Sequence, residues 1–361
     1  MKKFCIFCGE DPDEKTKEHV IPQWLIKLTG DPKREGFFGF DLVPDIPKIR
    51  TYSFNSFSFP ACSVCNNKYS NLEAAAQRVI ISVLNKEKLN DLDINSLIDW
   101  LDKVRIGLWL GLLYLSKNAP EISHRFHIDK RLGTADRLLF LYELSAEREG
   151  INFIGTESPS FLQVPSSFAI LINNFCFFNV SHFNLCDRRL GFPYARTAHY
   201  KDIDSLIEAD YVVGLERVLF PVMRERYLQS CSKFFQPIFI NIKNTEGANH
   251  FINNRYVLEN SFDWDKGIGS VFHEKSSKAV PFPRRKTLDW IPPAPKDLQS
   301  FLPKINRQVY DFQISVITKS ASFNRLSKKD KMIIKKELSF YKRVNKLVVE
   351  FVEKQSKEIR L

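Results

Sequence analysis

Two segments with helical spacing follow the first seventy residues of the chain. From Asn71, the segment LEAAAQRVIISVLNKEKL places apolar residues such as Leu72 and Val79 near the 3.6-residue period of a helix. A second segment, about residues 95–117, repeats this spacing. Its most apolar part is about twelve residues long and contains Arg105, whereas a membrane span needs about 20 apolar residues. The pattern therefore predicts two buried helices and no membrane-spanning segment.

The middle of the chain has the pattern of β-strands. Residues 167–180 (SFAILINNFCFFNV) form two apolar runs separated by Asn173-Asn174, and asparagine tolerates the left-handed backbone of a tight turn. Residues 236–242 and 250–257 predict a second strand pair. Five prolines between Phe272 and Asp297 predict an extended connector.

The end of the chain predicts one long basic helix, about residues 327–359, with an apolar stripe. From Ala321 to Leu361 there are 12 Lys and Arg against five Asp and Glu, which is +7 of the total formal charge of +11. A basic protein favours polyanionic partners, although the same charges also suit an ordinary solvated helix face.

Composition narrows the class of protein. Hydrophobic residues make up 44% and charged residues 26% of the 361 residues, which is typical of a globular chain with a sizeable core. The first residues are basic, but the apolar run that follows is too short for a secretory signal. A cytoplasmic, reducing location is therefore expected, in which paired cysteines indicate a metal rather than disulfides.

Four cysteines form two pairs with metal-ligand spacing, Cys5-x-x-Cys8 and Cys62-x-x-Cys65. Four thiolates can hold one zinc ion in a closed structural site with no position left for substrate. Such a site suits residues 1–75, a loop-rich segment with little core of its own. The remaining cysteines lack partners at this spacing and are expected to be ordinary buried thiols: Cys176, Cys186 and Cys231.

The residues around these pairs carry a family resemblance. The first pair is followed by Glu18-His19-Val20-Ile21-Pro22, and the second continues as Cys65-Asn66-Asn67 into a predicted helix. Together they resemble the HNH endonuclease family (His-Me finger, ββα-metal fold) in its four-cysteine branch. The resemblance covers about residues 4–75, a fifth of the chain.

The resemblance implies a role for each motif residue. It implies that His19 is the general base that deprotonates water, and that Glu18 and Asn66 bind a catalytic Mg²⁺ or another divalent ion. It also implies that the four cysteines hold structural zinc. Lys68, in the first turns of the same helix, is a candidate contact to substrate phosphate.

The sequence departs from the family pattern in two places. The residue after the last cysteine is histidine in many members and Asn66 here, which keeps an oxygen ligand suited to Mg²⁺. The middle asparagine of the motif has no clear match, and Asn55 is the nearest candidate. The stretch from Val20 to Ala61 is long enough to contain an inserted loop.

Each site residue also has an ordinary structural explanation. His19 can be a histidine satisfied by a neighbour, and Glu18 a solvent-exposed strand residue. Asn66 can cap the helix, since asparagine is a preferred N-cap residue, and this does not exclude ligation. Lys68 can simply face water.

We therefore expect an α+β protein. Its divisions are an HNH module with structural zinc (residues 1–95), a mixed domain of helices and antiparallel strands (96–290) and a helical basic region (291–361). The expected function is metal-dependent hydrolysis of phosphodiester bonds in double-stranded DNA, in a setting such as bacterial restriction or anti-phage defence. The alternatives are a zinc-stabilised nucleic-acid-binding module that does not cleave, and a subunit that docks onto a protein such as an ATPase.

Overall fold

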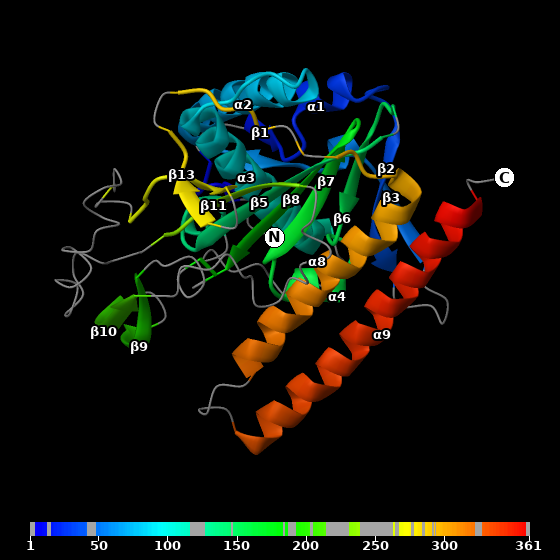
Figure 1. The fold of residues 1–361 in the computed structure, drawn as a ribbon. Coiled ribbons are helices and arrows are strands. Elements are labelled where there is room, and N and C mark those ends of the chain that lie inside the picture. Colours follow the sequence, from blue (N-terminus) through cyan, green and yellow to red (C-terminus); the bar gives the residue numbers. More distant parts are fainter. Residues whose placement is uncertain are drawn as a thin grey trace.

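A seven-stranded antiparallel sheet forms the centre of the protein (Figure 1). The computed structural model describes residues 4–12, 16–41, 48–115, 127–145, 147–182, 185–186, 193–202, 205–213, 231–238, 263, 267–275, 278–283, 286–290, 292, 294–321 and 327–358. In order across the sheet, the strands are β13 (Lys278–Pro281), β12 (Phe272–Lys275), β11 (Ser232–Gln236), β5 (Asp136–Glu143), β8 (Phe175–His182), β7 (Ser167–Ile172) and β6 (Ile151–Ile154).

The sheet is buried on both faces. Successive side chains of a strand point to opposite faces, so one strand can serve two cores. In β5, Leu139 and Leu141 belong to one hydrophobic cluster, whereas Leu138 and Phe140 belong to a second. The central strands therefore consist of nearly continuous apolar runs.

Helices cover the two faces. On one side lie α2 (Ser63–Leu84) and α3 (Asp91–Leu115), which share the first cluster with the N-terminal segment. On the other side, α8 (Leu298–Ala321) packs on the sheet, and α9 (Lys328–Glu358) runs beside α8 at the outside of the molecule (Figure 1). The short α4 (Pro159–Gln163) lies between β6 and β7 in the chain, and η2 (Ile128–Lys130) precedes β5.

The N-terminal segment is built on a two-stranded ribbon. Strand β1 (Thr16–His19) pairs antiparallel with β4 (Ser58–Ala61), and β4 leads directly into α2. The long stretch between the strands contains α1 (Gln23–Leu28), a hairpin of β2 (Glu35–Asp41) and β3 (Lys48–Ser53), and η1 (Phe54–Ser56). The insertion expected between Val20 and Ala61 is thus folded.

Two glycines allow α3 to approach this ribbon closely. A Cβ atom at Gly107 would lie 2.7 Å from Cγ1 of Val20, and one at Gly111 would lie 2.9 Å from Cζ of Phe59. Real Cβ contacts are longer than this. Glycine at both positions therefore sets the distance between the helix and the strands that carry the candidate site.

Several sequence predictions are confirmed. The protein is a mixed α+β structure with a four-cysteine cluster at its N-terminal end. Helix α3 corresponds to the helix expected at about 95–117, and α9 to the long basic helix. The hairpin at 167–180 forms as β7 and β8, with Asn173 at a positive φ of 49° in its turn.

Other predictions need correction. The apolar pattern that predicts the first helix begins at about Asn71, whereas α2 begins at Ser63. The pattern does not reveal its first turns, because they carry cysteine and asparagine rather than an apolar stripe. The expected proline connector contains the hairpin of β12 and β13, in which Pro281 is the last residue. Of the strand pair expected at 236–242 and 250–257, only the start of the first strand lies within the described residues.

Helix α8 and the central strand β5 were not predicted from the sequence. One further hairpin consists of β9 (Pro193–Asp202) and β10 (Ser205–Val213). No helix in the described part of the chain is both long and apolar enough to cross a membrane.

We expect Gly107→Ala to lower the free energy of unfolding by about 1–3 kcal/mol, since the new methyl group is forced into Val20. In a Val20→Ala background the same change should be neutral or stabilising, because alanine favours a helix over glycine by about 1 kcal/mol. Urea unfolding of the four proteins of this cycle measures both values. Equal effects of Gly107→Ala in both backgrounds would contradict the close contact.

Candidate functional site: a four-cysteine cluster beside a buried ion-pair network

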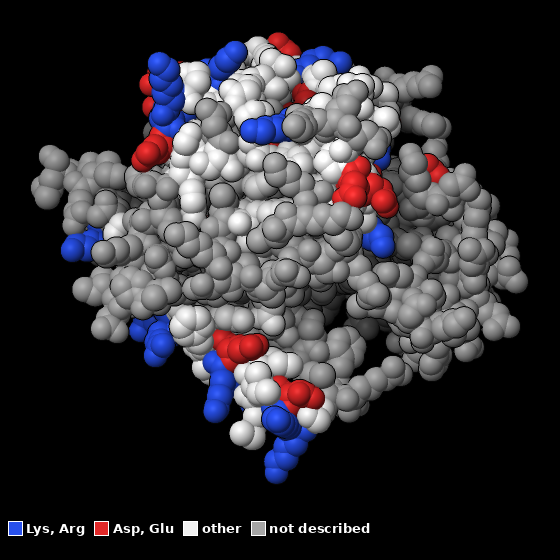
Figure 2. Space-filling view, turned by 180° about the vertical axis from the view of Figure 1, so that it is seen from behind, with Lys and Arg blue, Asp and Glu red and all other residues white. Residues whose placement is uncertain are grey.

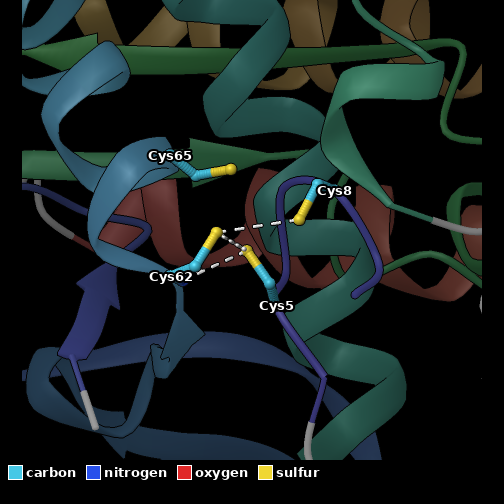
Figure 3. Close-up of side chains that lie close together, drawn as sticks. All are labelled: Cys5, Cys8, Cys62 and Cys65. Atoms are coloured by element: carbon cyan, nitrogen blue, oxygen red, sulfur yellow. Dashed lines mark hydrogen bonds between the residues drawn. The ribbon is translucent and has the colours of Figure 1, made fainter. Parts of the chain in front are cut away.

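The two cysteine pairs meet at the start of α2 (Figure 3). Cys5 and Cys8 come from the loop before β1, while Cys62 is the N-cap of α2 and Cys65 lies in its first turn. The Sγ atom of Cys62 lies 3.5 Å from that of Cys5 and 3.7 Å from that of Cys8. All four sulfur atoms lie within 4.8 Å of one another.

This spacing agrees with a tetrahedral zinc site. With Zn–S bonds of about 2.3 Å, the edge of a regular ZnS₄ tetrahedron is about 3.8 Å. The separations of 3.5 Å and 3.7 Å between these sulfurs lie close to that value. The four cysteines could therefore hold a metal such as zinc, as the sequence predicted.

The thiols interact strongly with one another. Burial raises the pKa of Cys8 to about 11 and that of Cys65 well above the usual range. Burial also acts to raise the pKa of Cys62, but hydrogen bonds from Cys65, Cys5 and Cys8 outweigh it and lower this pKa. A zinc ion would replace the shared protons, because its ligands are thiolates.

The cysteine loop is fixed to the rest of the site by backbone hydrogen bonds. The Ile6 N–H donates to the carbonyl of Pro60 in β4 at 2.9 Å. On the other side, Ile128 N–H donates to Ile6 and Asp129 N–H donates to Phe7, both at 2.9 Å. The loop therefore joins β4 to η2 at the same place where its sulfurs meet α2.

The ribbon presents different residues on its two faces. Glu18 lies opposite Phe59 on the inner face, which packs toward α3, and both are buried. His19 lies opposite Ser58 on the outer face and is half-buried. Burial, helped by the nearby charge of Lys17, lowers the pKa of His19 below its usual value, which favours the neutral imidazole.

Glu18 belongs to a buried ion-pair network. The Lys103 ammonium from α3 donates hydrogen bonds to Oε1 of Glu18 and to Oε1 of Glu73 in α2. Only 1% of the Lys103 side chain is exposed. The indole N–H groups of Trp24 and Trp100 also donate to Glu73, at 2.9 Å and 3.2 Å.

Burial and charge balance differently at Lys103 and at Glu18. Burial alone would lower the pKa of Lys103, but the two carboxylates outweigh burial and raise it. Burial also raises the pKa of Glu18, although Lys103 opposes this shift. One cation is thus shared by two carboxylates that belong to β1 and α2.

This arrangement bears on the expected Mg²⁺ site. Oε1 of Glu18 already accepts from Lys103, so a metal ion would have to use Oε2 or displace the ammonium. Within the described residues, no hydrogen bond joins Asn66 to Glu18 or to His19. The role of Glu18 and Asn66 as ligands of a divalent ion stays a prediction.

The remaining candidates lie near the start of α2. Asn66 is in the first turns of the helix and half-exposed, and it is not the N-cap, which is Cys62. Lys68 is exposed and pairs with Asp129 at 3.4 Å, so it does not simply face water. Asn55 lies in η1, and its side chain falls outside the described residues.

Neither Lys103 nor its pairing with Glu73 was predicted from the sequence. Charged residues within apolar helical segments were the available signal, because a fully buried charge requires a partner. Their positions alone could not show that α3 would bring Lys103 to Glu18, which lies 85 residues earlier in the chain.

Comparison with known proteins gave no match: no protein-family model, curated protein or solved structure is significantly similar to this chain. Functional conclusions therefore depend on the geometry and chemistry of the site and on the motif resemblance.

We expect the purified protein to contain about one zinc per chain, measured by elemental mass spectrometry. Cys62→Ser should lose the metal and lower the free energy of unfolding by about 4 kcal/mol or more, as expected for loss of a structural ion. Cys231→Ser is the matched control, because Cys231 lies outside the cluster, and it should keep its zinc. A metal-free wild-type protein of full stability would contradict the zinc site.

We expect Lys103→Met to lower the free energy of unfolding by about 3–5 kcal/mol, because it leaves two carboxylates buried without their cation. Adding Glu18→Gln and Glu73→Gln to the Lys103→Met protein should recover part of the lost free energy of unfolding. Chemical denaturation measures both changes. Lys68→Met removes an exposed ion pair and should cost no more than about 1 kcal/mol; an equal effect of the two lysine substitutions would argue against the buried network.

Proposed function

We propose that this protein is an endonuclease of the HNH type that hydrolyses phosphodiester bonds in DNA, with His19 as its general base. One observation carries the proposal: β1, which ends in Glu18-His19, pairs with β4, and β4 leads directly into α2, whose N-cap and first turn carry two of the clustered cysteines. This is the order of strand, strand and helix that the motif resemblance implies. The four cysteine sulfurs connect the loop before β1 to the start of α2.

His19 supplies the chemistry that the reaction needs. A neutral imidazole can take a proton from a water molecule while the water oxygen forms a bond to phosphorus. The bond from phosphorus to the leaving oxygen then breaks. His19 lies at the end of its strand on the outer face of the ribbon, where a phosphodiester can approach.

The charge distribution is compatible with a polyanionic substrate but does not select one. The formal net charge is +11, and α9 contributes much of it. On the face shown in Figure 2, basic side chains lie next to acidic ones in both the upper and lower parts of the molecule. DNA as the substrate, and a role in restriction or anti-phage defence, come from the motif resemblance.

A second candidate is a zinc-stabilised nucleic-acid-binding protein that does not cleave. The pairing of Glu18 with Lys103 favours it, because this carboxylate is the acidic ligand that the motif would offer to a metal ion. In this case the basic helix α9 would contact the phosphates.

We expect the purified protein to convert supercoiled plasmid DNA to nicked or linear forms in the presence of Mg²⁺. His19→Ala should reduce the rate at least about a hundredfold, since a general base contributes about 10²–10⁴-fold. Agarose gels of timed reactions, with and without a chelator, measure the rate and its metal requirement.

His273→Ala is the matched control. His273 is also half-buried and has a lowered pKa through burial, but it lies in β12 of the central sheet. The His273→Ala variant should cleave plasmid DNA at the wild-type rate. Intact plasmid with wild type and His19→Ala alike, together with equal gel shifts, would favour the non-cleaving candidate.

A further inference from the structure

Two buried polar atoms without partners lie opposite each other on the ribbon. Nδ1 of His19 and Oγ of Ser58 are both shielded from solvent, and neither makes a hydrogen bond within the described residues. The two residues are direct partners in the pairing of β1 with β4. A buried polar group left without a partner costs about 1–3 kcal/mol, so this juxtaposition needs an explanation.

The register brings these side chains close together. Val20 N–H donates to the Phe57 carbonyl at 2.9 Å, which makes the neighbouring pair, His19 and Ser58, a non-hydrogen-bonded pair of the ladder. In such pairs the Cα atoms are about 4.5 Å apart and the side chains of one face approach each other most closely. Pro60, which has no N–H, occupies the equivalent position opposite Lys17.

The two nitrogens of His19 differ in their surroundings. Nδ1 is shielded on the ribbon, whereas Nε2 is not among the buried atoms without partners. The nitrogen that is bonded internally decides which tautomer an imidazole adopts. A hydroxyl beside Nδ1 can accept a hydrogen bond from Nδ1–H, which leaves the Nε2 lone pair available.

We propose that Ser58 is a positioning residue that holds His19 in the tautomer protonated at Nδ1. Nδ1–H donates to Oγ of Ser58, directly or through one water molecule. Nε2 is then unprotonated and can accept a proton. The proposed tautomer depends only on the pairing of His19 with Ser58 in the ribbon of β1 and β4. Its consequence for catalysis rests on the proposed function.

Ser58 is not one of the motif residues; in the motif the residue that helps to orient the base is the middle asparagine. Serine is small enough to sit opposite an imidazole on neighbouring strands. Alanine in its place would keep the strand but remove the acceptor, and threonine would restore a hydroxyl on a residue type that strands favour. Comparison of Ser58→Ala with Ser58→Thr therefore separates the effect of the hydroxyl group from the effect of side-chain packing.

The test uses the full-length protein labelled with ¹⁵N-histidine. Long-range ¹H–¹⁵N spectra distinguish an unprotonated ring nitrogen from a protonated one, and the His19→Gln spectrum identifies the His19 signals. We expect Nε2 to be unprotonated in the wild type, the equilibrium to shift toward the Nε2–H tautomer in Ser58→Ala, and Ser58→Thr to restore the wild-type pattern. The same three proteins are then assayed for plasmid cleavage, where Ser58→Ala should lose up to about a hundredfold in rate.

The outcomes are distinguishable. An Nε2–H tautomer in the wild type, or an unchanged tautomer in Ser58→Ala, would overturn the proposal. A tautomer that shifts as expected in a protein that never cleaves DNA would support the positioning by Ser58 and count against the nuclease function. Loss of cleavage in Ser58→Ala without a tautomer shift would show that the serine acts in some other way.

Discussion

The burial of one lysine between two carboxylates is the constraint on which the N-terminal part of the structure depends. Lys103 is almost fully buried, and its ammonium joins Glu18 of β1 to Glu73 of α2. A buried charge is tolerated only when it is paired, so separating these three elements would leave charges buried without partners. The cysteine cluster forms a second connection in the same region, because it joins the loop before β1 to the start of α2. The candidate base His19 is therefore held between two independent cross-links.

The features that could be predicted from the sequence are those whose signal lies in residues close together along the chain. The two Cys-x-x-Cys pairs, the Asn173 turn and the periodic α9 each carry their signal within a few residues, and the structure contains all three. The β12–β13 hairpin was hidden because prolines around it are typical of a connector. Helix α8 has Pro303 near its start and follows a proline-rich stretch, which obscured its apolar spacing.

The candidate site was predictable only in part, for the same reason. The Cys-x-x-Cys spacing indicated which cysteines could share an ion, because the two cysteines of each pair are close together in the chain. Each pair also precedes a motif that can be recognised in the sequence. It could not indicate that Glu18 faces the interior, since the inner and outer faces of β1 are decided by what packs on them. Nor could it reveal Ser58 beside His19, because that contact depends on the register of two strands separated by a folded insertion.

Pro60 has a consequence for how this protein behaves at high concentration. Two-stranded ribbons expose backbone groups along their outer edges, and such edges invite pairing with strands of other molecules. At Pro60 the outward-facing position has no N–H, and its carbonyl is already bonded to Ile6 of the cysteine loop. Pairing of another strand at this position of the β4 edge is thereby disfavoured, because the loop that carries Cys5 and Cys8 already occupies it.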